Sequence, residues 1–286
     1  MPRLFLLKLD CPDRIGLLAS LTTLIAEHEG NFVDVQQYTD SLNKVFFVRL
    51  AFEIPASLEI ASLEKALEFF SAKNEASWTL RDQTTPIRTA LLVSQTNHCL
   101  ADLLWRWRSK ELNITITCVI SNHENLRAEV EREGLGFIYL PIPKEEHAKE
   151  AAFQNMAIIL DESGTDLIVM CRYMQVLPAW LCNKYAHRII NIHHSLLPAF
   201  AGAEPYQQAY NRGVKLIGAT CHYATEELDA GPIIDQEVIR VDHFHSPEDL
   251  RRLGRDCEKL ALARGIRFHV DERVLVHGTR SIVFGD

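Results

Sequence analysis

The spacing of apolar residues over the first 83 positions switches between strand-like and helix-like periods. Strands are expected at 4–9, 31–38, 45–52 and 76–80, where apolar, β-branched and aromatic residues gather. Helical spacing begins at Leu17 and ends at Gly30, which we interpret as a C-terminal glycine, and a second helix is expected at 56–73. The order βαββαβ predicts a ferredoxin-like four-stranded sheet with both helices on one face.

A polar, proline-containing stretch at 82–86 marks the expected domain boundary, so we predict domains at 1–83 and 84–286. Beyond it, strands expected at 88–94, 114–121, 137–140, 167–170 and 189–191 alternate with helices at 98–111, 124–133 and 145–161. This alternation predicts a Rossmann-like α/β domain with a mostly parallel sheet covered on both faces. Ligands of such sheets bind beyond the carboxyl ends of the strands.

Composition narrows the class of protein. The 286 residues carry a formal net charge of −8, which disfavours a nucleic-acid partner. No apolar run approaches the ~20 residues of a membrane span, and no signal segment stands out, so we predict a cytoplasmic protein without a membrane partner. The seven cysteines are scattered and read as reduced, buried thiols, and neither they nor the pair His243 and His245 indicate a metal site.

Candidate chemistry gathers after the strand at 189–191. Asn191 and His193 alternate along it, so they should point the same way and could stabilise the oxygen of a carbonyl that becomes tetrahedral. An ordinary hydrogen-bonded loop would look the same. Further along, Asp229 follows Glu226 and Glu227 before a Gly-Pro pair, a pattern typical of a solvated turn. A carboxylate beside an imidazole and an amide is, however, the set that activates water.

These motifs carry a family resemblance. Asn191-Ile192-His193, Ser195-Leu196-Leu197-Pro198 and Leu228-Asp229-x-Gly231-Pro232-Ile233-Ile234 resemble the signature of the folate-dependent formyltransferase fold, over residues 87–286. Residues 1–83, with Cys11-Pro12-Asp13-Arg14-Ile15-Gly16, resemble an ACT regulatory domain. The combination resembles the formyltetrahydrofolate deformylases. It implies Asn191, His193 and Asp229 as the catalytic trio of a hydrolase that releases formate and tetrahydrofolate from 10-formyltetrahydrofolate, in one-carbon metabolism and purine biosynthesis.

Two features favour hydrolysis over transfer to another acceptor. Glycinamide ribonucleotide transferases carry a glycine-rich loop after the first strand of this fold, whereas residues 94–99 contain no glycine. His194 follows the catalytic histidine, where purine-pathway transferases usually have proline and deformylases have a histidine pair. The alternatives are a formyltransferase acting on a sugar nucleotide or initiator tRNA, and an inactive amino-acid sensor.

The resemblance also implies how folate is held. The pterin slot is expected from Met174, Val176 and Leu177 together with Thr225, Glu226 and Leu228, although the first three taken alone would be plain core. Gln175 and Glu204 stand where the family usually has basic residues. For Asp229 we expect a raised pKa, which a partly desolvated loop can supply.

The ACT resemblance implies a small amino-acid effector, with glycine and methionine as candidates, and a homo-oligomer formed by pairing of the domains. A bound carboxylate is expected near Asp13 and Gly16, beside a helix N-terminus. The expected small molecules are the folate substrate, water and this effector. No cofactor and no metal are predicted.

Overall fold

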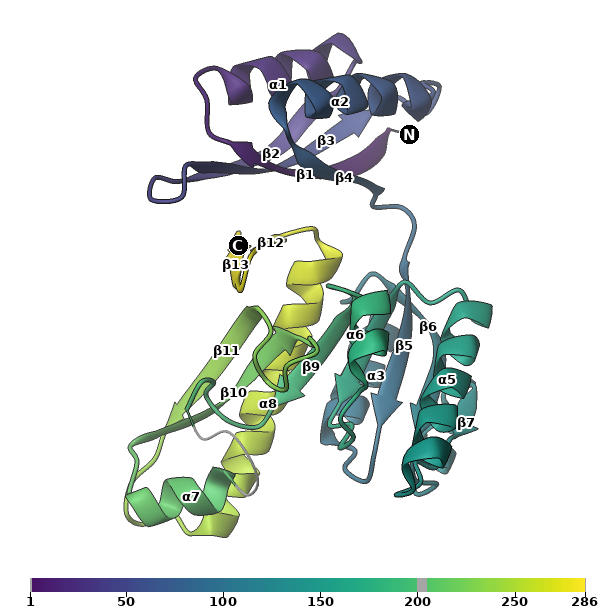
Figure 1. The fold of residues 1–286 in the computed structure, drawn as a ribbon, viewed down its shortest axis with the longest axis vertical. Helices are drawn as coiled ribbons and strands as arrows, with labels where there is room; N and C mark the ends of the chain where they lie inside the picture. The colour runs from purple at the N-terminus through teal and green to yellow at the C-terminus, as the bar shows by residue number, and fades with distance from the viewer. Residues whose placement is uncertain (1, 200–204, 286) are drawn as a thin grey trace. The chain divides into compact units, whose positions relative to one another are not determined.

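The structure, a computed structural model, describes residues 2–199 and 205–285 and divides into two compact units (Figure 1). One unit comprises Met1–Pro86 with Phe268–His277 and Ser281–Asp286, and the other comprises Ile87–Arg267 with Gly278–Arg280. The C-terminal end of the chain thus clusters with the N-terminal unit, which the pattern of apolar residues did not indicate. The predicted boundary at residue 83 stays a prediction.

The first unit is built on a four-stranded antiparallel sheet in the order β2-β3-β1-β4, with α1 and α2 on one face (Figure 1). Its elements confirm the predicted βαββαβ order. The strands are β1 (Arg3–Pro12), β2 (Asn31–Asp40), β3 (Val45–Ile54) and β4 (Ser77–Asp82), and the helices are α1 (Leu17–Glu27) and α2 (Ile60–Asn74). Leu21, Ile25, Leu63 and Leu67 bury the helices against the sheet, where burial of apolar side chains drives folding.

Gly30 does not have the role that the sequence suggested. The left-handed residue after α1 is Glu29, with φ 59°, whereas Gly30 lies against the helix end. A Cβ atom at position 30 would stand 2.4 Å from Cγ2 of Ile25. Glycine is therefore required for close packing and not for its conformational freedom.

Polar contacts within the first unit hold the C-terminal segment to this sheet. Lys8 of β1 forms an ion pair of 2.7 Å with Glu272, and Nε of the buried Arg49 of β3 donates to the backbone oxygen of Asp271 at 2.9 Å. Burial lowers the pKa of Arg49, while the carboxylate of Asp34 opposes that shift. The segment also forms the short hairpin β12 (Val274–His277) and β13 (Arg280–Val283).

The second unit contains a seven-stranded sheet in the order β11-β10-β9-β8-β5-β6-β7. The five strands from β9 to β7 run parallel, and β10 and β11 are antiparallel, so the prediction of a mostly parallel sheet is confirmed. The strands are β5 (Ile87–Val93), β6 (Ile114–Ser121), β7 (Phe137–Tyr139), β8 (Leu167–Cys171), β9 (Ile189–His193), β10 (Leu216–Tyr223) and β11 (Ile233–Arg240).

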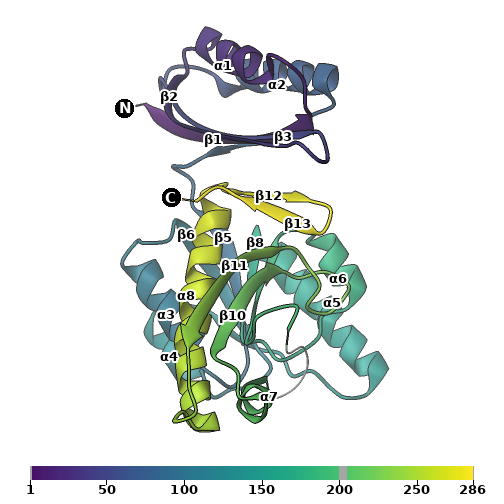
Figure 2. The ribbon, with the colours of Figure 1, turned by 90° about the vertical axis from the view of Figure 1, so that its left-hand side faces the viewer.

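Helices cover both faces of this sheet, with α5 and α6 on one side and α3 and α8 on the other (Figure 2). Phe153, Met156 and Leu160 of α5 are buried against residues of β5, β6 and β8. The helices in the described part of this unit are α3 (His98–Arg108), α4 (Arg127–Arg132), α5 (Glu146–Glu162), α6 (Ala179–Lys184), α7 (Pro205–Arg212) and α8 (Pro247–Val270). In the described parts of the chain, no helix is both long enough and apolar enough to cross a bilayer.

The strand order reverses between β5 and β8, because the chain leaves β5 toward β6 and returns to its other side as β8. Such a reversal separates the loops at the carboxyl ends of the two strands and creates room for a ligand. The loops after β5, β8 and β9 all begin at this edge.

The seven cysteines are all buried and unpaired, which confirms their reading as thiols.

Candidate active site

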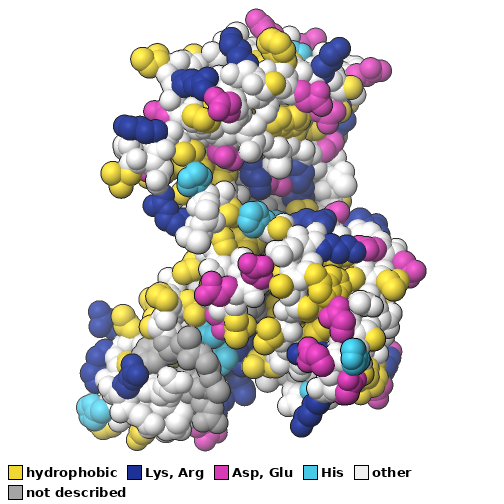
Figure 3. All heavy atoms as spheres, in the orientation of Figure 1, with side chains coloured by type: hydrophobic (Ala, Val, Ile, Leu, Met, Phe, Trp, Pro, Cys, Tyr) yellow, Lys and Arg dark blue, Asp and Glu magenta, His cyan; other side chains and the backbone are white. Residues whose placement is uncertain are grey.

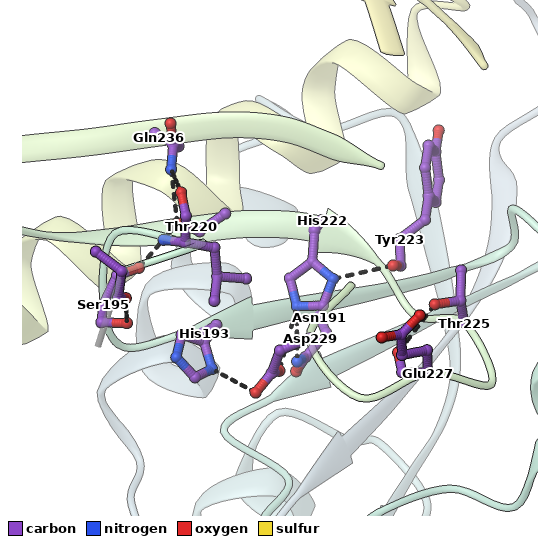
Figure 4. A network of polar contacts seen from close by, with 12 residues as sticks. Asn191, His193, Ser195, Thr220, His222, Tyr223, Thr225, Glu227, Asp229 and Gln236 are labelled. Carbon is purple, nitrogen blue, oxygen red and sulfur yellow. Dashed lines mark hydrogen bonds and ion pairs between the residues drawn. The ribbon is translucent and has the colours of Figure 1, made fainter. Parts of the chain in front are cut away.

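The register of two antiparallel strands brings the first catalytic candidates together. On β9 and β10, His193 pairs with Thr220 and Asn191 pairs with His222. Directly opposed side chains on one face of a sheet touch. Nδ2 of Asn191 accordingly lies 3.2 Å from Nε2 of His222 (Figure 4).

His222 fixes the orientation of the Asn191 amide. Nδ1 of His222 lies 2.9 Å from the carbonyl oxygen of Tyr223, which can only accept, so Nδ1 carries the proton. Nε2 is then an acceptor and takes one N–H of Asn191, which leaves the second N–H for another partner. Burial lowers the pKa of His222 and keeps this neutral form. Sequence reasoning passed over His222, although polar residues at 220 and 222 of an otherwise apolar strand are a usable signal.

Asp229 reaches the same place from the loop after β10. Its backbone is left-handed, with φ 56°, a conformation that aspartate tolerates better than most residues. Oδ2 of Asp229 lies 3.2 Å from Nδ1 of His193, and Oδ1 lies 3.7 Å from Nε2 of His222. Because Nδ1 of His193 faces this carboxylate, Nε2 is left buried without a hydrogen-bond partner among the residues described. Figure 4 shows the three side chains converging.

The predicted raised pKa of Asp229 is wrong for the free protein. The hydrogen bond from His193 lowers the pKa of this carboxyl and outweighs the partial burial that would raise it. Asp229 is therefore ionised at neutral pH and holds the His193 ring in one orientation. The sequence could not reveal this, because burial and pairing act in opposite directions and only the geometry decides between them.

The trio lies in a cleft of about 370 Å³ that also contains every residue predicted to hold folate. Met174, Val176 and Leu228 are 59%, 55% and 64% exposed, which rules out the plain-core reading for Met174 and Val176. Leu177 is buried and belongs to the core as well as to the cleft wall. The lining includes Met174, Gln175, Val176, Leu177, Asn191, His193, His194, His222, Thr225, Glu226, Leu228 and Asp229.

The end of β5 supports the apolar rim of this cleft. Oγ of the buried Ser94 accepts the backbone N–H of Met174 at 3.0 Å and donates to Oδ1 of Asn122 at 2.7 Å. Ser94 stands where the glycinamide ribonucleotide transferases carry a glycine-rich loop. Here it links the residues that follow β6 and β8 through hydrogen bonds. The sequence indicated only that glycine is missing there.

A second set of hydrogen bonds fixes the loop that follows His193. Oγ1 of the buried Thr220 donates to the carbonyl of Ser195 at 2.8 Å and accepts the N–H of Leu197 at 3.0 Å. Nε2 of Gln236 on β11 donates to the carbonyl of Leu197 at 3.0 Å. These bonds, drawn in part in Figure 4, hold residues 195–197 in place beside the trio.

His194 is expected to stay neutral throughout the ordinary working range of pH. Burial, aided by the positive charge of Arg172, lowers the pKa of His194 to about 4. Because its folded pKa lies below the unfolded value, the unfolded chain binds more protons as pH falls from the unfolded pKa toward 4, and stability falls with it. Titration of the ring by nuclear magnetic resonance checks this. An ordinary histidine midpoint would contradict the account.

Exposure separates the expected effects of two neighbouring substitutions. Val176→Ala should leave the free energy of unfolding within about 0.5 kcal/mol of wild type, because the side chain is half exposed, while weakening binding of the ligand that the cleft holds. Leu177→Ala should lower the free energy of unfolding by about 2–5 kcal/mol, because Leu177 is buried in the core. Denaturant unfolding and steady-state kinetics measure both. Equal losses of stability would contradict the assignment of Val176 to the cleft.

The remaining predicted residues have different outcomes. Gln175 lines the cleft, and Glu204 lies outside the described residues. Asp13 and Gly16 are exposed, and Gly16, with φ 87°, directly precedes the first residue of α1. Their role toward an effector stays a prediction.

Comparison with known proteins defines the class that this fold and site belong to. The family model for formyl transferases matches residues 87–266, and the ACT domain model matches residues 5–68. The crystal structure of glycinamide ribonucleotide transformylase 1 from Symbiobacterium toebii superimposes with a TM-score of 0.66 at 30% identity, over 72% of this chain and 98% of that one. The second unit is thus a formyl transferase domain, and the first contains an ACT domain.

Two further relatives match nearly the whole chain. Formyltetrahydrofolate deformylase of Bacillus subtilis is 41% identical over 280 residues, which cover 97% of this chain and 93% of that protein. The crystal structure of a formyltetrahydrofolate deformylase from Pseudomonas syringae has a TM-score of 0.95 and 45% identity, over 99% of this chain and 95% of that one. This chain belongs to the formyltetrahydrofolate deformylase family.

Proposed function

We propose that this protein is a hydrolase that converts 10-formyltetrahydrofolate and water into tetrahydrofolate and formate. The observation that carries the proposal is the convergence of Asn191, His193 and Asp229 in one cleft with exposed apolar walls. Deformylase relatives of nearly full length support the same reaction. Formate release and a tetrahydrofolate product place the protein in one-carbon metabolism, with purine biosynthesis as a user of the formate.

The residues divide the chemistry between them. The pterin ring lies between Met174, Val176 and Leu177 on one side and Thr225, Glu226 and Leu228 on the other, which brings the formyl carbon to the trio. Asp229 accepts a proton as water attacks that carbon, and Asn191 donates its free N–H to the developing oxyanion. Nε2 of His193 adds a second donor in the form of the ring that carries a proton on both nitrogens, since Nδ1–H is directed at Asp229. The C–N bond to N10 then breaks as N10 takes up a proton. The sum is one formate, one tetrahydrofolate and one proton released.

The lowered pKa of Asp229 in the free protein does not conflict with its role as a base. Bound folate would displace water from the cleft, and loss of water raises the pKa of a carboxyl group. Burial already acts in that direction on Asp229 and is outweighed only by its contact with His193. The carboxylate therefore becomes more basic when the substrate is present.

Transfer to another acceptor is less well supported. An initiator tRNA needs a basic surface, whereas Lys and Arg side chains are interspersed with Asp and Glu over the face drawn in Figure 3. The net charge of −8 works in the same direction. Water needs no binding surface of its own, so the cleft as built is sufficient for hydrolysis.

The ACT domain supports regulation by a small amino acid, with glycine and methionine as candidates, and assembly into a homo-oligomer. No cofactor beyond the folate substrate is needed for the chemistry proposed. Cytoplasmic location stays a prediction.

Formate release from 10-formyltetrahydrofolate with no acceptor added tests the proposed reaction. We expect multiple turnovers, with tetrahydrofolate and formate produced in equal amounts. Release that requires an added sugar nucleotide or tRNA would instead favour a transferase. An absence of turnover with every acceptor would favour the amino-acid sensor.

A further inference from the structure

A buried carboxylate outside the catalytic trio binds three side chains from different parts of the second unit. Glu258 of α8 is 1% exposed, accepts the hydroxyl of Tyr206 at 2.7 Å and lies 2.7 Å from Nε2 of His98. Nε of Arg172, directly after β8, lies 3.2 Å from the same carboxylate. Burial raises the pKa of Glu258, but the His98 hydrogen bond and the Arg172 charge outweigh it and hold the pKa below its usual range. The mechanism described so far uses none of these groups.

Arg172 is the member of this network that reaches the catalytic cleft. Among the cleft-lining residues that the structure describes, it is the sole lysine or arginine, whereas Glu226 and Asp229 are acidic. Its Nε is buried and lies 3.2 Å from Glu258 as an ion pair without a well-aligned hydrogen bond. The structure gives no hydrogen bond from its two terminal nitrogens to a described residue. A guanidinium group can serve two carboxylates at once, because its donors lie along different edges of a plane.

The conformation of Arg172 is costly. Its φ is 61°, in the left-handed region that a residue with a Cβ atom adopts at a cost in free energy. Pairing a buried carboxylate with an arginine is also weak as a source of stability, because both groups must lose water. Strain and a buried ion pair at the end of a sheet strand are features that concentrate at functional sites.

Metal binding is the other reading of this cluster. His98, Cys99 and Glu258 present ligand atoms within 4.8 Å of one another. The Glu258 oxygens, however, are already engaged by Tyr206, His98 and the cationic Arg172. Burial moves the pKa of Cys99 well above its ordinary value, so the thiolate that a metal requires is disfavoured. The cluster is better suited to hold a guanidinium group than an ion.

We propose that Arg172 binds the oxygens of the formate product, and that Glu258, with His98 and Tyr206, is the positioning group that holds Arg172 in place. This inference rests on the proposed hydrolysis, which turns the neutral formyl group into an anion beside the anionic Asp229. Transfer of the formyl group to an amine would yield a neutral amide and would need no such cation. The terminal nitrogens of Arg172 offer formate a paired set of donors.

Binding of sodium formate to the substrate-free protein tests the proposal, followed with carbon-13-labelled formate and by product inhibition. We expect Arg172→Met to weaken formate binding by about tenfold or more, the loss of a charge-assisted pair of hydrogen bonds. Arg172→Lys should restore part of it. Glu258→Gln should weaken formate binding and lower kcat while the KM for folate stays near wild type, a split that simple destabilisation would not give.

Arg252→Met is the matched control, because Arg252 is an exposed residue of α8 whose ion-pair partner among the residues described is Asp249. It should bind formate as wild type does. The inference is overturned if wild type binds no more formate than an equal concentration of chloride explains, or if Arg172→Met binds formate as wild type does. Failure of the proposed function is separate, because it shows as absent turnover whatever the formate affinity.

Discussion

Asp229→Asn should lower kcat by about 10⁴-fold, at the upper end of what a positioned acid–base group contributes. The amide cannot accept the proton of the attacking water. It also replaces the carboxylate that lies 3.2 Å from Nδ1 of His193, so the ring loses the partner that orients it. The KM for folate should change much less, because the apolar walls of the cleft are untouched. Steady-state formate release measures both constants.

Glu227→Gln is the matched control for this change, since it removes an acidic side chain from the same loop. Glu227 is exposed and does not line the cleft, and its backbone oxygen, not its carboxylate, accepts the hydrogen bonds from Thr225 and Ala230. We expect wild-type kinetics for it. If Asp229→Asn kept full activity, the carboxylate would not be the base and the mechanism would be wrong.

Asn191→Ala should lower kcat by about 10²–10³-fold, the usual effect of removing one oxyanion donor. Its amide is held by His222, so the free N–H points in a fixed direction before the substrate arrives. The loss should appear in kcat and in kcat/KM alike, because the donor acts in the transition state. Single-turnover kinetics separate this chemical step from product release.

Asn211→Ala, on α7 and remote from the trio, provides the comparison for an asparagine removed from the surface. It should turn over like wild type. A variant lacking Asn191 that bound folate poorly but reacted at the normal rate would show that the amide serves binding and not the oxyanion.

The fold was largely predictable because both units follow regular periods. Alternation of apolar strands and helices predicted the mostly parallel sheet of the second unit. The βαββαβ order of the first 83 residues predicted the four-stranded antiparallel sheet of the first unit. Contacts between distant parts of the chain were not predictable. The attachment of Asp271 and Glu272 to Arg49 and Lys8 depends on where the end of α8 lies, and no local pattern encodes that.

The candidate site shows the same division. Asn191 and His193 could be paired from strand alternation alone, and the family signature supplied Asp229. His222 could not be placed, because its role follows from the β9–β10 register and from a bulge beside it. Arg172 and Glu258 are 86 positions apart by their numbers, and only the packing of α8 against the end of β8 joins them. The pKa of Asp229 was predicted in the wrong direction because its partner could not be seen.

The central claim is that water is the acceptor of the formyl group, and turnover in water enriched in oxygen-18 tests it most directly. We predict that the purified protein, given 10-formyltetrahydrofolate and no other acceptor, releases formate containing one oxygen-18 atom, with an equal amount of tetrahydrofolate. Asp229→Asn should abolish the labelled product. Formate that carries no label, or a formyl group that leaves folate only when an amine acceptor is added, would contradict the account.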